Sequence, residues 1–138
     1  MGQQQLLLLV IGVIVVGFAV LAGFAAGQTK MKQNAADNLV DRNLSIATEA
    51  VYWKTKRDPF NGGNAQYTGL ETDGMQTLFL GEETNNGLFQ ITSATDEELE
   101  ITAVSLTYPE IGARTLVRDY EIVSTEVRFD GSITLDSE

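Results

Sequence analysis

The sequence contains no cysteine and no histidine, and only 9 of its 138 residues are lysine or arginine. Without cysteine, disulfides, thiol nucleophiles and thiolate metal sites are excluded; without histidine, so is a Ser-His-Asp triad. The net charge of −10 argues against nucleic-acid binding, which needs clustered lysine and arginine. The composition therefore predicts a protein that is not an enzyme, carries no cofactor or metal and binds no nucleic acid.

Charge is distributed unevenly along the chain. Residues 1–29 carry no charged side chain, and residues 30–58 carry six basic and four acidic ones. Residues 59–138 carry fifteen acidic and three basic side chains. We therefore expect three segments: an apolar helix over 1–27, an amphipathic continuation over 28–58 and an acidic head domain over 59–138.

Leu6 to Ala26 is an unbroken run of 21 apolar or glycine residues. As a helix it would be about 31 Å long, enough to cross the hydrocarbon core of a membrane. A secretory signal peptide with a cleavage site near Gly27 is the alternative, although no basic residue precedes the run. Lys30 and Lys32 lie on the C-terminal side of the run, and the positive-inside rule would keep that side in the cytoplasm. An acidic head is more natural outside the cell. Removal of a short basic leader before Met1 would explain the conflict.

Small residues are spaced along the apolar run. Ala19, Gly23 and Gly27 recur every four residues, and Gly12 and Gly17 lie further toward the N-terminus. Small residues at this spacing let helix backbones approach closely in lipid or in an apolar bundle. The pattern indicates a helix that packs against copies of itself, although an ordinary membrane anchor is also rich in glycine.

From Thr29 to Asp58 the apolar residues follow a helical period and form two stripes. The first stripe consists of Ala35, Leu39, Ile46, Ala50 and Trp53, and the second of Ala36, Val40, Leu44, Ala47 and Val51. We expect the first to cover the sheet of the head, with Leu39, Ile46, Ala50 and Trp53 in the core. The second either meets neighbouring helices or is buried in the same domain. Pro59 and the Gly62-Gly63 pair should end the helix, which then spans about residues 4–58.

Beyond Asn64 the apolar period becomes two, which predicts an antiparallel sheet and an α+β fold. The expected strands are Met75–Leu80, Leu88–Thr92, Leu99–Tyr108, Asp119–Phe129 and Ile133–Leu135. We expect tight hairpins at Asn85-Asn86-Gly87 and at Asp130-Gly131, and a β-bulge near Ser124 because the apolar alternation changes parity there.

Three weaker motifs have structural explanations. Asp96, Glu97, Glu98 and Glu100 miss the calcium-loop spacing, and Thr95 with Glu98 fits a capping box or turn. Asp130 and Asp136 flank a predicted hairpin rather than a metal site. The Asn43-Leu44-Ser45 glycosylation sequon falls within a predicted helix, so a chance match is the simpler explanation.

The order of an apolar helix, an amphipathic continuation and a small antiparallel sheet resembles the type IV pilins. The resemblance implies cleavage by a prepilin peptidase, after Gly2 if this chain is the precursor, and methylation of Gln3 as the new N-terminus. The family's glutamate at the fifth mature position is replaced by Leu7, or by Gln5 if counting starts at Met1. Gln5 would then replace the family's ion pair with a neutral hydrogen bond.

The resemblance implies a subunit that polymerises through its apolar helix into an extracellular, pilus-like filament for adhesion, motility or surface attachment. Its partners would be copies of itself, the cytoplasmic membrane before assembly and a pilus assembly machinery. The alternative is a single-pass membrane protein with an extracytoplasmic binding or assembly head, such as a minor pilin, a pseudopilin or an adaptor.

Overall fold

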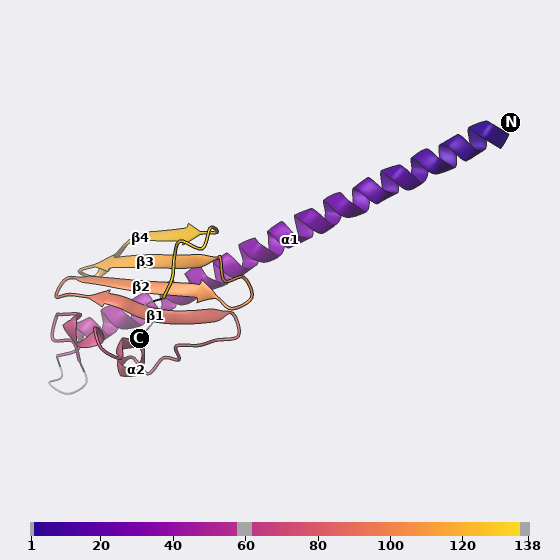
Figure 1. The fold of residues 1–138 in the computed structure, drawn as a ribbon. Coiled ribbons are helices and arrows are strands. Elements are labelled where there is room, and N and C mark those ends of the chain that lie inside the picture. The colour runs from indigo at the N-terminus through magenta and orange to yellow at the C-terminus, as the bar shows by residue number, and fades with distance from the viewer. Residues whose placement is uncertain (1, 58–61, 136–138) are drawn as a thin grey trace. The chain divides into compact units, whose positions relative to one another are not determined.

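The computed structural model describes residues 2–57 and 62–135 and shows an α+β chain with one long helix and a four-stranded sheet (Figure 1). The sheet is antiparallel throughout, with the strands in chain order. The predicted fold class, a long N-terminal apolar helix packed on a small antiparallel sheet, is therefore confirmed. The elements are α1 (Gly2–Thr55), the 3₁₀ turn η1 (Thr68–Leu70), α2 (Gly74–Thr77), β1 (Gly87–Ala94), β2 (Glu98–Ser105), β3 (Gly112–Arg118) and β4 (Glu121–Arg128).

The chain forms two compact units, Met1–Gln33 and Asn34–Glu138. Every side chain from Gly2 to Met31 is exposed, whereas all buried core residues lie in the second unit. The second unit, which we call the head, therefore has a hydrophobic core of its own, to which the helix contributes residues from Ala36 onward.

The helix ends at Thr55, earlier than the predicted boundary at Asp58 and Pro59, which both lie outside the described residues. The returning loop supplies donors to the last carbonyl groups of the helix: Gly63 N–H bonds the carbonyl of Trp53 and Ala65 N–H that of Lys54. These bonds satisfy acceptors that a helix leaves unpaired at its C-terminus. The predicted role of the Gly62-Gly63 segment in closing the helix is thus carried by backbone hydrogen bonding.

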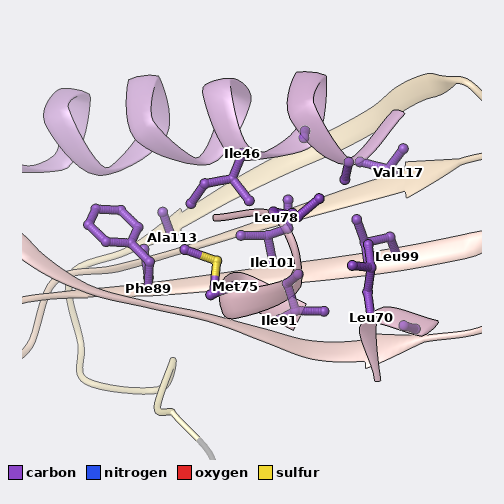
Figure 2. Close-up of a cluster of buried hydrophobic side chains, with 14 of the residues drawn as sticks. Ile46, Leu70, Met75, Leu78, Phe89, Ile91, Leu99, Ile101, Ala113 and Val117 are labelled. Carbon is purple, nitrogen blue, oxygen red and sulfur yellow. The ribbon is translucent and has the colours of Figure 1, made fainter. Parts of the chain in front are cut away.

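Figure 2 shows the core of the head, where side chains from α1, α2 and one face of the sheet point toward one another. Ile46 of α1 lies over Ile101 and Ala113 of the sheet, and Met75 enters from α2. Leu39, Ile46 and Ala50 are fully buried and Trp53 is nearly so. The predicted burial of these four residues in the core is therefore confirmed, but Trp53 packs against Gly63 and Gly69, in the loop after the helix and in η1, and not on the sheet.

The predicted strand over Met75–Leu80 is wrong, because this segment forms α2 and the turn that follows it. Met75 and Leu78 are both buried, and a spacing of three places two side chains on one face of a helical turn. The chain then turns at Phe79, whose backbone is left-handed with φ 59° and whose side chain is 89% exposed. The turn at Asn85-Asn86 does form, but it joins an isolated Glu83–Leu88 bridge rather than two full strands.

The central part of the predicted sheet also needs correction. The strand predicted for Leu99–Tyr108 ends at Ser105, and Gly112–Arg118 forms β3, which the sequence analysis did not identify. Asp119, predicted to begin a strand, instead starts the two-residue turn between β3 and β4 with φ 55°. The register shifts where Leu116 pairs with Ser124 and Val117 with Ile122, so the predicted bulge near Ser124 is confirmed at Val123.

The last predicted strand, Ile133–Leu135, is absent from the described residues, so Asp130-Gly131 does not form a hairpin. Gly131 N–H donates to the carbonyl of Glu110, which holds the segment beside the β2–β3 loop. Ile133 is buried against Gly112, where an added Cβ would meet the isoleucine side chain at 2.6 Å. The segment is therefore held against the start of β3 by side-chain packing instead of strand pairing.

Candidate assembly surfaces

The largest candidate surface is the apolar segment of α1. The helix is long and apolar enough to cross a membrane, with a mean hydropathy of 3.0 and none of that window buried. Large apolar side chains such as Leu9 and Phe24 are more than 60% exposed. Exposed apolar area of this extent marks a membrane-binding or protein-binding surface.

The glycines predicted to mediate packing all lie on this exposed segment. An added Cβ at Gly12, Gly17, Gly23 or Gly27 would meet nothing within 4 Å, so no contact inside the chain requires glycine there. A glycine in a helix interior costs up to about 1 kcal/mol relative to alanine. Ala19 and Gln5 are likewise exposed, and Gly2 and Gln3 begin the helix.

Trp53 anchors the C-terminal end of α1 to the head. Its ring lies against two glycines: an added Cβ would approach the indole to 2.7 Å at both Gly63 and Gly69. Glycine is needed at these positions because backbone and ring meet directly. The indole therefore packs between Gly63, in the loop after α1, and Gly69, in the 3₁₀ turn η1. This contact fixes the end of the helix in the head.

Lys54, the next residue, forms a second attachment that the sequence analysis missed. Its ammonium lies 4.4 Å from the ring centre of Tyr67 and 4.7 Å from that of Tyr120, and it donates a hydrogen bond of 3.2 Å to the Asp119 carbonyl. The Tyr67 hydroxyl donates to the same carbonyl. Burial, together with the nearby charges of Tyr120 and Asp119, raises the pKa of Tyr67 to about 12. This cluster fastens the end of α1 to the β3–β4 turn.

The second apolar stripe divides between burial and exposure. Ala36 and Ala47 are buried in the head, whereas Val40, Leu44 and Val51 are half-buried. Burial in the same domain is therefore confirmed for Ala36 and Ala47, and contact with neighbouring helices stays a prediction for the other residues of the stripe. The half-buried residues leave an apolar strip along α1 that the described part of the chain does not fully cover.

Part of this strip forms one wall of a groove in the head. The groove has a volume of about 460 Å³ and is lined by Ala47, Thr48, Val51, Tyr120, Glu121 and Ile122. The groove lies beside β4, the edge strand that α2 and η1 leave open. These two elements pack over β1 instead, and β4 exposes almost all its side chains. Tyr120 and Ile122 are 51% and 41% exposed. Sequence reasoning missed this groove, because the spacing of Tyr120 and Ile122 does not show which segment lies opposite them.

The structure also shows where the three weaker polar motifs lie. Thr95 forms a turn with Glu98 through backbone and side-chain hydrogen bonds, which confirms the predicted turn. Within residues 2–57 and 62–135, no group of three or more acidic side chains has the arrangement of a metal site. Asp136 lies outside the described residues. Asn43 is fully buried and its amide donates to the Ala113 carbonyl at 3.4 Å, so the sequon is inaccessible in the folded head.

Comparison of the chain with protein-family models, with curated proteins and with solved structures finds no match. Its function is therefore argued from the surfaces described above.

Proposed function

We propose that this protein is the structural subunit of an extracellular, pilus-like helical filament, assembled through the apolar part of α1. The observation that carries the proposal is that every residue of the helix from Leu6 to Ala26 is exposed, on a chain whose head has its own core. This apolar surface needs an apolar environment, and a membrane supplies it before assembly. A bundle of identical helices supplies it afterwards.

The glycine positions favour the bundle over a solitary anchor. No contact within the chain explains Gly12, Gly17, Gly23 or Gly27, although each weakens the helix. Close approach of neighbouring helix backbones does explain Ala19, Gly23 and Gly27, which share one helix face. At about 25 cal/mol per Å² of buried apolar area, repeated helix contacts stabilise a polymer without covalent links.

The acidic head fits the outer surface of such a filament. Residues 59–138 carry fifteen acidic and three basic side chains, and like charge on neighbouring filaments keeps them dispersed in water. One heterologous contact repeated between identical subunits generates an open helix. Adhesion, motility or surface attachment are the roles that such a filament serves, and processing at Gly2 by a prepilin peptidase belongs to the same proposal.

The test is electron microscopy of material sheared from cells that express the full chain, with mass spectrometry of the fibres. We expect long homopolymers in which residues 6–27 are protected from protease and the head is accessible. The second candidate function, a single-pass membrane protein with a binding or assembly head, rests on the helix being long and apolar enough to span a membrane. Its signature would be protein retained in the membrane, extracted by detergent as monomers, with no fibres.

A further inference from the structure

The charged side chains nearest to the apolar segment of α1 lie beyond its C-terminal end and are basic. Leu6 to Ala26 carries no charge, and Lys30 and Lys32 follow it. No aspartate or glutamate precedes Asp37, so residues 1–36 carry two basic side chains and no acidic one. The N-terminal end of the segment is preceded by neutral glutamines. The apolar segment therefore has positive side chains at one end only.

The helix sets the depth of these lysines in a membrane. α1 runs without a break from Gly2 to Thr55, so the lysines are held on the same rod as the apolar segment. At about 1.5 Å per residue, Lys30 lies about 6 Å and Lys32 about 9 Å beyond Ala26. The apolar segment fills a hydrocarbon core about 30 Å thick, and the headgroups occupy about the next 5–8 Å on each side. Long lysine side chains extend toward that layer, so both ammonium groups reach the lipid phosphates when the segment spans a membrane.

Other polar groups at this level of the helix carry no charge or are already bonded. The Thr29 hydroxyl donates a hydrogen bond of 3.1 Å to the Ala25 carbonyl within the helix. The backbone N–H groups also bond within the helix, because α1 neither begins nor ends near them. Lys30 is exposed and Lys32 is half-buried. An anion that meets this part of the chain is therefore bound through lysine ammonium groups.

We infer that Lys30 and Lys32 bind the phosphate groups of anionic phospholipids at the end of the apolar segment, an inference that rests on the membrane stage of the proposed function. Their charge complements an anionic headgroup, and the exposed apolar surface of Leu6 to Ala26 leads directly to them. Two residues are about 200° apart around a helix, so the two lysines meet different lipids. Each lysine near an anionic surface strengthens such binding about fivefold.

The acidic head of a neighbouring copy is the other occupant that this charge would suit. Lipid is favoured because it surrounds any segment that spans a membrane, at the depth where the lysines lie, and needs no particular arrangement of two copies. A contact with a neighbouring head would make the lysines matter for fibres and leave the choice of lipid unchanged. The two occupants therefore give different results in one set of variants.

The test uses the full-length protein in vesicles of phosphatidylcholine with a minor fraction of phosphatidylglycerol. Electron spin resonance of spin-labelled lipids measures which of the two occupies the lipid shell of the protein. We expect a preference for phosphatidylglycerol of at least about fivefold, weakened by sodium chloride. Lys30→Gln with Lys32→Gln should reduce the preference to less than about twofold. Lys30→Arg with Lys32→Arg should retain it, because arginine keeps the charge.

The control variant is Lys56→Gln with Arg57→Gln. It removes the same amount of charge from two exposed positions that follow the end of α1, far along the chain from the apolar segment. The control should keep the lipid preference of the natural chain. No preference in the natural chain, a preference unchanged by the glutamines at 30 and 32, or an equal loss in the control would each overturn the inference. A loss with arginine as large as with glutamine would overturn it as well.

These results are separable from the filament proposal. Fibres from a chain with no lysine-dependent lipid preference would leave the filament proposal standing and refute the lipid contact. A lysine-dependent preference in a chain that forms no fibres would leave the lipid contact standing and favour the single-pass function. Fibres lost in the Lys30→Gln and Lys32→Gln variant, with its lipid preference unchanged, would assign the lysines to a neighbouring head and overturn the inference.

Discussion

The indole ring of Trp53 lies directly on the backbone of Gly69, so closely that a methyl group on Gly69 would come within 2.7 Å of the ring. The ring is 7% exposed and belongs to the same core as Leu70 and Tyr67. Replacing Trp53 with alanine in the head fragment 34–138 should lower the free energy of unfolding by about 3–5 kcal/mol. Urea titration followed by circular dichroism measures this, with Tyr52→Ala, 60% exposed on the same helix, as the control. A change near zero would mean that the indole contributes little to the core.

The other side of this contact gives a second prediction. Gly69→Ala should lower the free energy of unfolding by about 1–3 kcal/mol, because the large indole ring has to move to admit the methyl group. Gly81→Ala is the matched control, since its Cβ would meet only the Glu83 carbonyl at 3.6 Å. Equal stability of the two variants in the same titration would contradict the close contact between the Trp53 ring and Gly69.

Tyr67 predicts how stability depends on alkaline pH. Its pKa is raised from 10.0 to about 12, chiefly by burial and then by the charges of Tyr120 and Asp119. Between these values the unfolded chain releases the phenolic proton while the folded head retains it. Stability is therefore full below pH 10 and falls as the pH rises toward 12, by up to about 2 kcal/mol.

The fall can be measured by unfolding the head at a series of pH values in the alkaline range. Tyr67→Phe should reduce the slope of stability against pH there, even though it loses the hydrogen bond to Asp119 at every pH. The slope is the informative quantity because the lost hydrogen bond shifts the whole curve. An unchanged slope would assign the alkaline transition to another group.

Gly23→Leu should abolish fibre formation and leave the head folded. Gly23 shares a helix face with Ala19 and Gly27, and a leucine there would push a neighbouring backbone away by several ångströms. A loss of about 1–2 kcal/mol at each contact shifts polymerisation by about tenfold or more. Val20→Leu, a similar apolar change off that face, is the control for electron microscopy of sheared material. Equal fibres from both variants would favour the single-anchor function.

Much of the fold is readable from the sequence because long periodic signals report burial directly. The helix and its buried residues follow from a helical spacing maintained from Leu39 to Trp53. The bulge at Val123 follows from a change of parity within one strand. Such patterns extend over several turns or residue pairs, so they survive local exceptions.

The errors fall where the signal is short or the residues are small. Met75 and Leu78 fit either a strand or one helical turn, and only tertiary packing decides between them: Gly74 lies close against Ile91 and Leu70, and Met75 and Leu78 join the same core. β3 was missed because its inward residues include Ala113 and Thr115, which carry weak hydrophobic signals although both are fully buried. The groove was beyond sequence reasoning because its walls come from segments about seventy residues apart, brought together by tertiary packing.

The two attachments at the end of α1 determine how the head would carry a mechanical load. A pull on Asn34 along the helix axis acts parallel to the contact between helix and sheet, so many side chains slide together instead of separating one at a time. Trp53, held between Gly63 and Gly69, and Lys54, bound to the Asp119 carbonyl, resist that sliding at the far end of the helix. Under tension the head should consequently behave as a shear-loaded joint, with its rupture force set by the last two buried residues of the helix.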